Sequence, residues 1–287
     1  MDFVADLAGG LARKLSAAGL TYDEQLRRDD PVGFMAQYIE YQRRRISQRP
    51  RRVELSQELQ SSPLLQKFAA AVCNLTELSR KGADLSPYQS KRIKFFNKRD
   101  MMLYDWKIQH LHLGEHKPGE KFAERTSELL FATFLTNAVY LIAIMDHDSF
   151  SEIELLEIVE ANWPEYLDQF TLKGLTAVSP VPTSADVAMQ REEGVQTVVT
   201  LKSGKILGPP GGGYSYARTS VSCMREAQLI ARLLWNAEEL VKAREEEIRV
   251  RLEISSEVQI RLAEYDPKYV AIIGEGGSKL LKLPVGQ

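Results

Sequence analysis

An uncharged run of seventeen residues, LLFATFLTNAVYLIAIM at 129–145, constrains the fold of this chain more than any other feature. A helix that crosses a bilayer needs about 20 apolar residues, whereas this run is shorter and contains Thr133, Thr136 and Asn137. Polar residues at 136–137 are typical of a turn, and the apolar stretches on either side have the length of buried strands. The run therefore predicts two strands, at 129–134 and 138–145, joined by a tight turn.

The segment IQHLHL, residues 108–113, precedes this run and alternates as a strand does. Ile108, His110 and His112 are therefore expected on one face of that strand. A polar loop at Gly114–Gly119 follows it. Because short connections favour antiparallel neighbours, we expect QHLHLG and the two apolar strands to be adjacent in one antiparallel sheet, with a helix at 152–162 nearby.

Helical and strand patterns outside this region predict an α+β protein: a small antiparallel sheet flanked by helices, with N-terminal helices and a long C-terminal helix with extra strands. The expected helices begin at 3–20 and at Asp30-Pro31, continue at about 61–80, and include the long helix at 221–253. A hairpin is expected to turn at Ser203-Gly204, and two or three strands close the chain. Three segments follow from these patterns: a helical region at 1–83, an α+β core at 84–170, and a hairpin, long-helix and strand unit at 171–287.

Composition excludes several classes of protein. The net charge is −2, so binding to nucleic acid would have to depend on a local basic patch. Cys73 and Cys223 are the only cysteines, too few for a disulfide framework or a cysteine-based zinc motif. Asp2 and Asp6 lie where a secretory signal would carry lysine or arginine, so a reducing, cytoplasmic location is expected. The sequence contains no P-loop, GxGxxG, GxSxG, HExxH or kinase-type signature.

All four histidines lie within one short window, at 110, 112, 116 and 147. Imidazoles at 110 and 112 on one strand face could be metal ligands or an acid/base pair that acts on one substrate. The other interpretation is one structural histidine and one exposed histidine. A metal site would need further ligands, which His147 and its flanking aspartates could supply, but the spacing matches no zinc signature.

Arg125, Thr126 and Ser127 immediately precede the first apolar strand. An arginine at a strand entrance, near histidines, suits an anionic phosphate group. The alternative is a solvated loop arginine, which is the commonest environment of this residue.

Two basic clusters could track a phosphate backbone. The first, residues 43–52, holds six arginines and no acidic residue, and the second, residues 91–99, surrounds Phe95 and Phe96 with basic residues. Both clusters could instead be solvated helix faces, and for the two phenylalanines we favour a place in the core over base stacking. The residues proposed to contact substrate are Thr126, Ser127, Lys91, Arg92, Lys94, Arg43, Arg44 and Arg45.

The order of features from Trp106 to Trp163 resembles the RelE-like branch of the bacterial ribonuclease-toxin fold, which groups barnase, EndoU, colicin nuclease and RelE-type toxins. The resemblance lies in a strand ending HLHLG, a loop, Arg125, the strands LLFATF and VYLIAIM, then His147 and a helix. It implies an α+β nuclease core with these residues in its site. The flanking helices and the C-terminal segment lie outside it.

The leading functional hypothesis is an endoribonuclease of toxin or defence type that uses no metal and no other cofactor. His110 and His112 would be the acid/base pair, Arg125 would hold the phosphate and His147 would assist. RNA and a neutralising protein are the expected partners, and no membrane association is expected. Two alternatives stay open: a non-enzymatic nucleic-acid-binding or interaction protein that uses the arginine run, and a metal-dependent hydrolase built on His110, His112, His147 and Asp148.

Overall fold

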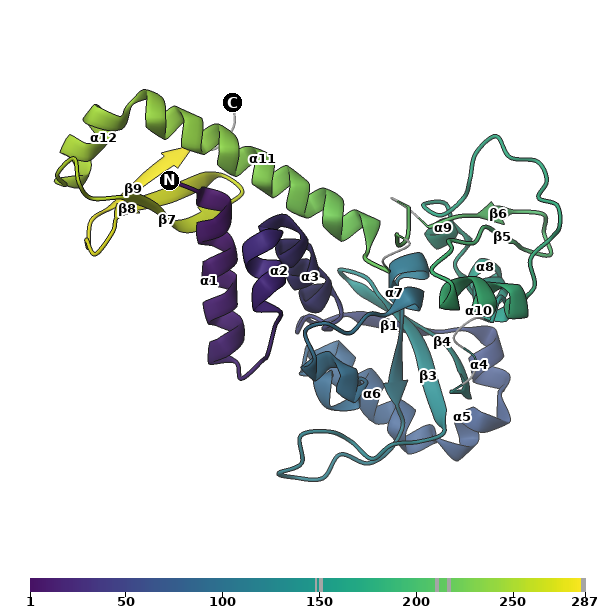
Figure 1. Ribbon diagram of the computed structural model, residues 1–287. Coiled ribbons are helices and arrows are strands. Elements are labelled where there is room, and N and C mark those ends of the chain that lie inside the picture. The colour runs from purple at the N-terminus through teal and green to yellow at the C-terminus, as the bar shows by residue number, and fades with distance from the viewer. Residues whose placement is uncertain (148, 150–151, 210–211, 216–217, 285–287) are drawn as a thin grey trace. The chain divides into compact units, whose positions relative to one another are not determined.

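The computed structural model describes residues 1–147, 149, 152–209, 212–215 and 218–284. The protein belongs to the α+β class, as predicted (Figure 1). It divides into two compact units, each described by itself below. Unit 1 comprises Met1–Glu40, Phe95–Asn97 and Cys223–Gln287, and unit 2 comprises Tyr41–Lys94 and Lys98–Ser222. These bounds follow spatial contacts, whereas the segments 1–83, 84–170 and 171–287 follow sequence patterns and stay a prediction.

Unit 2 is built on a sheet that contains the three antiparallel strands that the sequence predicts. Strand β2 (Ile108–His112) pairs with β3 (Glu128–Phe134), which pairs in turn with β4 (Ala138–Asp146). His110 lies opposite Phe131, and His112 lies opposite Leu129. The β3–β4 turn is closed by a 2.9 Å hydrogen bond from the Leu135 amide to the Ala138 carbonyl. The predicted pair of strands within the uncharged run is therefore confirmed.

A fourth strand, β1 (Arg52–Leu55), lies beside β4 and runs parallel to it, so the strand order is β1-β4-β3-β2. The sequence did not indicate this strand, because four residues next to an arginine run are too few for a strand pattern to be recognised. The sheet is consequently mixed rather than wholly antiparallel. Strand β2 forms its other edge.

Helices cover both faces of this sheet. On one face Leu111, Leu130 and Leu141 pack against Leu59 and Leu75 of the α4 and α6 helices. On the other face, Ile108, Leu129 and Phe131 pack against side chains from α8 (Glu154–Asn162) and α9 (Pro164–Leu167), the former being the helix expected at 152–162. Double burial explains why β3 and β4 are apolar at nearly every position instead of alternating.

The helices of unit 2 are shorter than predicted. In place of one helix at 61–80, the structure has α5 (Pro63–Lys67) and α6 (Ala69–Lys81). They are separated at Phe68, whose φ of −110° and ψ of 20° depart from helical values. The segment at 84–100 forms the short helices η1 (Ser86–Tyr88) and η2 (Lys91–Lys94). Strands β5 (Val199–Thr200) and β6 (Ile206–Leu207) form the predicted hairpin, in which Gly204 takes a positive φ of 86° at the turn.

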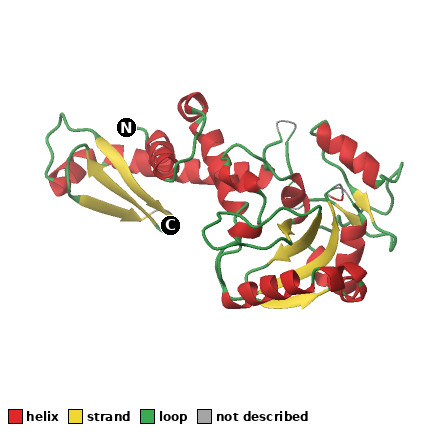
Figure 2. Ribbon diagram, turned by 90° about the horizontal axis from the view of Figure 1, so that it is seen from below, coloured by secondary structure: helices red, strands yellow, loops and turns green. Residues whose placement is uncertain are grey.

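Unit 1 packs helices against a three-stranded antiparallel sheet (Figure 2). The strands are β7 (Ile260–Asp266), β8 (Tyr269–Gly274) and β9 (Leu280–Pro284). Asp6 of helix α1 (Phe3–Ala17) binds β7, because its carboxylate accepts the Leu262 amide at 2.9 Å and pairs with Arg261 at 2.9 Å. The other helices at this end are α2 (Glu24–Asp29) and α3 (Pro31–Arg43), and α3 begins at the predicted proline.

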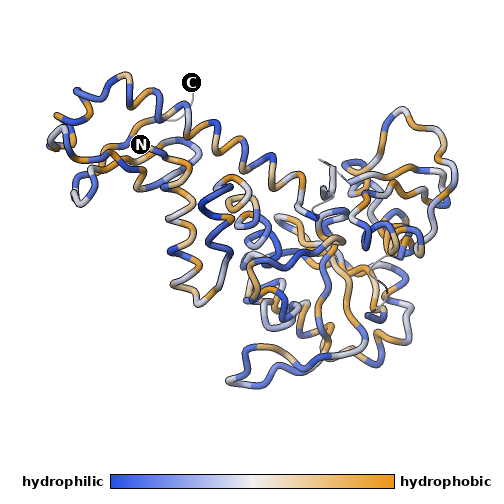
Figure 3. The backbone as a smooth tube through the Cα atoms, in the orientation of Figure 1, coloured by the Kyte–Doolittle hydropathy of each residue, from blue (hydrophilic) through white to orange (hydrophobic). Residues whose placement is uncertain are grey.

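The predicted long helix at 221–253 is two helices, α11 (Val221–Ala243) and α12 (Glu245–Leu252). The break falls at Arg244, where φ is −122° and ψ is 27°. Hydrophilic and hydrophobic residues alternate along α11, as Figure 3 shows, and its buried positions follow helical spacing. No helix of the described chain combines the length and apolarity that crossing a bilayer requires.

Ser56 tests how much the β1 strand and the start of α4 (Gln57–Ser61) contribute to stability. Its side chain is fully buried, donates to the Ile142 carbonyl at 2.5 Å and accepts the Leu59 amide at 2.9 Å. Ser56→Ala removes the helix cap and a buried hydrogen bond, so the free energy of unfolding should fall by about 1–3 kcal/mol. Ser61→Ala, at an exposed serine of the same helix, should change it by less than about 0.5 kcal/mol. Urea titration followed by circular dichroism measures both, and equal midpoints for the two variants would contradict this role.

Candidate functional site

Three of the four histidines meet at one end of the strands in the sheet of unit 2. His110 and His112 lie on β2, and His147 directly follows β4. The ring centroids are 6.2 Å apart for His110 and His112, 6.5 Å for His110 and His147, and 6.0 Å for His112 and His147. The antiparallel pairing of β2, β3 and β4 produces this cluster, because it returns the end of β4 to the end of β2.

His112 is a buried, neutral imidazole. Its side chain is 4% exposed, and burial lowers its pKa to about 3, with smaller contributions in the same direction from the charge of Arg125 and from the neighbouring histidines. A backbone hydrogen bond with Thr126 acts in the opposite direction. Within the described part of the chain, the Nδ1 atom has no hydrogen-bond partner. His112 therefore carries no charge at neutral pH and cannot act there as a proton donor in its charged form.

His110 and His147 differ from His112 in their access to solvent. Burial lowers the pKa of His110, and the positive charges of Arg125 and Arg92 add to this effect, while the nearby carboxylate of Asp100 opposes it. His147 is exposed. The cluster thus places a partly buried imidazole, that of His110, beside the exposed imidazole of His147.

A cavity of about 440 Å³ lies beside the cluster, within unit 2. Its volume falls within the range of small-ligand sites. His110 and His147 line it together with four arginines, at positions 44, 92, 99 and 191. Gln109, the neighbour of His110 in sequence, also lines it. Side chains of both strand faces reach the same cavity because β2 is an edge strand.

Two buried glutamines fix one wall of the cavity. Gln89, 4% exposed, donates through Nε2 to the Arg44 carbonyl at 2.8 Å and to Oε1 of Gln109 at 3.0 Å. Its own Oε1 accepts the Ile46 amide at 3.3 Å. These contacts hold the backbone of Arg44 and the side chain of Gln109 on either side of Gln89. Arg44 is itself only 5% exposed.

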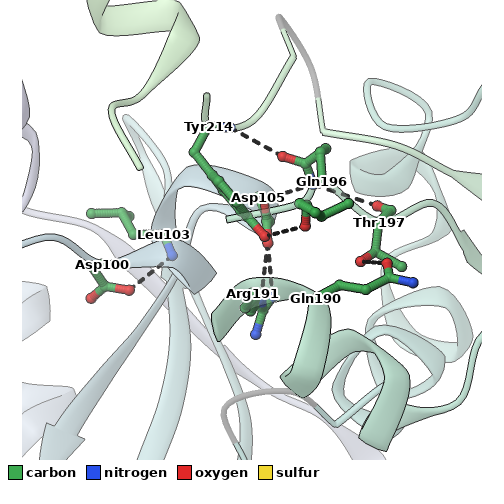
Figure 4. A network of polar contacts seen from close by, with 9 residues as sticks. Asp100, Leu103, Asp105, Gln190, Arg191, Gln196, Thr197 and Tyr214 are labelled. Atoms are coloured by element: carbon green, nitrogen blue, oxygen red, sulfur yellow. Dashed lines mark hydrogen bonds and ion pairs between the residues drawn. The ribbon is translucent and has the colours of Figure 1, made fainter. Parts of the chain in front are cut away.

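Arg191 reaches the cavity from helix α10 (Ser184–Glu192) and is held by a buried ion pair (Figure 4). Its Nε and Nη2 donate to Oδ2 of Asp105 at 3.1 Å and 2.9 Å. Gln196 donates to the other oxygen of Asp105 at 3.1 Å, and its own Oε1 accepts the Tyr214 amide at 3.1 Å. Burial raises the pKa of Asp105, and the charge of Arg191 opposes that rise.

Arg125 lies close enough to the cluster to lower the pKa of His110 and of His112, but it does not line the cavity. Its Nη1 donates to the Gln89 carbonyl at 3.0 Å, and its guanidinium lies 5.6 Å from the Phe122 ring centre. The hydroxyls of Thr126 and Ser127 are engaged locally. Thr126 accepts the Leu113 amide at 3.1 Å and donates to the Glu128 carbonyl, and Ser127 donates to the Glu128 carboxylate. These two residues therefore hold the start of β3.

Each of the two basic clusters contributes to the cavity through only some of its residues. From the first, Arg44 lines it, whereas Arg43 donates to the Ser222 hydroxyl at 2.9 Å and Arg45 to the Tyr41 hydroxyl at 2.8 Å. From the second, Arg92 and Arg99 line it. Lys91 is exposed, and the Lys94 ammonium lies 4.4 Å from the Phe122 ring centre.

The prediction that both phenylalanines of the second cluster lie in the core is wrong for one of them. Phe96 is buried and packs on Phe34 at a centroid distance of 5.4 Å, but Phe95 is 52% exposed. Only one of these two adjacent side chains is buried, so two aromatic residues in sequence did not by themselves indicate that both lie in the core.

Sequence reasoning missed Gln89, Gln109, Asp100 and Arg191 as cavity residues. A glutamine within a strand, on the same face as Leu111 and Leu113, was a signal that could have drawn attention to Gln109. Arg191 offered none, because it lies 44 residues beyond His147 and 79 beyond His112 in sequence. Asp148, part of the proposed metal set, lies outside the described residues. Among those that are described, no group of three histidine, cysteine or carboxylate side chains is arranged to hold a metal ion.

No protein-family model, curated protein or solved structure matches this chain. The site is therefore interpreted from its own chemistry.

The depressed pKa of His112 predicts a pH-dependent stability. Between about pH 6.5 and pH 3 the unfolded chain binds a proton at this residue that the folded chain does not bind, so stability is fully present above pH 6.5 and falls as the pH is lowered. From pH 7.5 to pH 5 the contribution of His112 to the free energy of unfolding should decrease by about 2 kcal/mol.

His112→Gln, which does not titrate, should remove that part of the pH dependence. His116→Gln, at a histidine outside the cluster, should retain it. Urea titrations at the two pH values measure the difference, and an identical pH dependence for wild type and His112→Gln would refute a neutral, buried His112.

Proposed function

We propose that this protein is a metal-independent endoribonuclease that cleaves RNA by histidine acid/base catalysis. The observation that carries the proposal is the cluster of His110, His112 and His147, with ring centroids 6.0–6.5 Å apart, beside a cavity lined by arginines. Cleavage of this kind needs a base, an acid and fixed positive charge, and each has a candidate within this small region.

The base in this proposal is His110. It lines the cavity, and its lowered pKa keeps the imidazole neutral at physiological pH, as a base requires. It would take the proton of the ribose 2′-hydroxyl as the 2′-oxygen bonds to phosphorus. His147 is the acid, because it lines the same cavity and is exposed to solvent. It would give a proton to the 5′-oxygen as the bond from phosphorus to that oxygen breaks.

His112 takes a different role from the one that the sequence suggested. A pKa of about 3 leaves it without a proton to donate from the charged form at neutral pH, and it does not line the cavity. The His112 ring lies beside the rings of His110 and His147. In this proposal His112 is therefore a positioning residue that sets the orientation of both rings.

Positive charge for the transition state comes from Arg125 and the cavity arginines. Arginine keeps its charge in proteins and matches the geometry of phosphate oxygens. Arginines beside neutral histidines supply the positive charge that binds a phosphodiester, while the imidazole of His110 stays neutral and can act as the base. The resemblance to RelE-type toxins supports the same reaction class, and a toxin or defence role with a neutralising protein partner forms part of the proposal.

A non-enzymatic RNA-binding module is the second candidate. The observation in its favour is that Arg44 and Arg92, from the two separate basic clusters, line one cavity. The histidine cluster favours the enzyme over this alternative, because a surface that only binds phosphates has no need for neutral imidazoles.

The cleavage assay uses a single-stranded RNA with mixed sequence. His110→Ala and His147→Ala should each lower the rate by about 10²–10⁴, and Arg125→Ala by a similar factor. His116→Ala replaces a histidine outside the cluster, whose side chain contacts the Glu120 carbonyl, and this variant should cleave as the wild type does.

The product should carry a 2′,3′-cyclic phosphate. Activity should be unchanged in EDTA, and a 2′-deoxy sugar at the cut site should block cleavage. Cleavage of DNA or loss of activity in EDTA would favour a metal-dependent hydrolase, and no cleavage of any RNA would favour the binding module.

The pH profile of kcat/KM distinguishes the assigned roles. A base must be neutral to act, so the lowered pKa of His110 should keep the rate high below pH 6.5, the ordinary histidine value, before it falls at lower pH. An acidic limb that stays unchanged in His110→Ala would assign the base elsewhere.

A further inference from the structure

The cavity beside the histidine cluster is rich in hydrogen-bond donors. Four arginines and one carboxylate, Asp100, are the charged residues that line it. A guanidinium has five N–H donors and no acceptor. The Asp100 carboxylate is partly occupied, because it accepts the Leu103 amide at 3.0 Å and so caps helix α7 (Met101–Trp106). The lining therefore favours a ligand that is anionic and carries several acceptor atoms.

Gln109 adds a further donor, and its side chain is held in place by a hydrogen bond from Gln89. Its side chain is 8% exposed, and its Oε1 is already used to accept from Gln89. The amide is thereby oriented with its Nε2 as the remaining polar atom, and within the described chain that nitrogen has no hydrogen-bond partner. This nitrogen is accessible from the cavity, so an acceptor atom of a bound ligand can receive a hydrogen bond from it there.

Phosphate is the anion that fits this wall best. Arginine binds phosphate oxygens in a bidentate manner, and the group presents acceptors in several directions at once. A nucleobase would need acceptors as well as donors around it, because every base edge that pairs carries donor groups too. The charge of Arg191 is compensated by Asp105, so the charges that face the cavity are those of Arg44, Arg92 and Arg99 against one carboxylate, a balance that matches a phosphate better than a base.

We propose that the cavity binds a second phosphate of the RNA chain, the one that flanks the scissile phosphodiester. This inference rests on the proposed function, since His110 and His147 lie in the cavity lining and the scissile group must lie beside them. With Arg125 outside the lining and near the histidines, the two phosphates have separate arginines: Arg125 for the scissile group, and Arg44, Arg92 and Arg99 for the flanking group. Gln109 donates to the flanking phosphate.

Binding is measured first, with probes that cannot be cleaved. These are 2′-deoxy dinucleotides with a terminal phosphate at the 5′ end, at the 3′ end, or at neither. For the wild type, one of the two terminal phosphates should tighten binding by about tenfold or more, because charge-assisted hydrogen bonds to a buried group are strong. Isothermal titration calorimetry at fixed salt measures the three affinities.

The variants identify where that phosphate binds. Arg92→Gln removes an exposed charge from the lining, and Gln109→Glu replaces a donor by a carboxylate of the same size while leaving Gln89 an acceptor. Both should abolish the gain from the terminal phosphate. The matched control is Arg45→Gln, since Arg45 is next to Arg44 in sequence, binds Tyr41 and does not line the cavity. This control should keep the gain, and circular dichroism and urea midpoints verify that all variants fold.

The same substrates with ribose at the cut site connect binding to cleavage. Addition of the flanking phosphate should raise kcat/KM in the wild type by about the factor seen in binding, and the increase should be lost in Gln109→Glu.

The subsite is overturned if a terminal phosphate tightens binding at neither end, or if both cavity variants retain the tighter binding. If the gain depends on Gln109 and Arg92 but RNA is never cleaved, the cleavage proposal fails and the phosphate subsite stands. If cleavage depends on His110 while the flanking phosphate has no effect, only the subsite fails.

Discussion

Burial of β3 and β4 on both faces is the constraint on which the rest of unit 2 depends. Side chains that point one way from β3, such as Leu129 and Phe131, pack against α8 and α9, and those that point the other way, such as Leu130 and Ala132, pack against α4 and α6. A sheet centre that is apolar at nearly every position offers few side chains for a polar site. The polar residues are consequently displaced to the edge strand β2 and to the ends of the strands, where the histidines and the cavity lie.

The charge states of the residues in the site follow from their location at the edge strand and at the strand ends. Histidines next to the buried centre lose solvent, and because burial disfavours their charged form they are neutral at physiological pH. Arginines respond differently, since their pKa is too high for burial to neutralise them. One small region therefore combines neutral imidazoles with permanent positive charge. The ion pair between Asp105 and Arg191 attaches α10 to the same region, and removal of either partner would leave a buried charge.

Local patterns were sufficient for much of the fold. Strands β2, β3 and β4, the hairpin of β5 and β6, and the start of α3 at Pro31 were all predicted, because each depends on residues close together in sequence. Helix ends were less predictable: the breaks at Phe68 and Arg244 lie in continuous helical patterns. Strand β1 was missed, since its partner β4 lies more than 80 residues away and four residues carry too little pattern.

The sequence by itself determined which residue types could carry chemistry, and it determined that His110 and His112 share one strand face, because alternation is a local property of a strand. Only the tertiary structure decided which residues meet. It brought His147 to His110 through the antiparallel return of β4, selected Arg44 and Arg92 from runs of similar basic residues, and added Gln89, Gln109 and Arg191. The physical reason is that a cavity is lined by segments whose proximity depends on the packing of the whole unit, and neighbouring basic residues on a turn or short helix point in different directions.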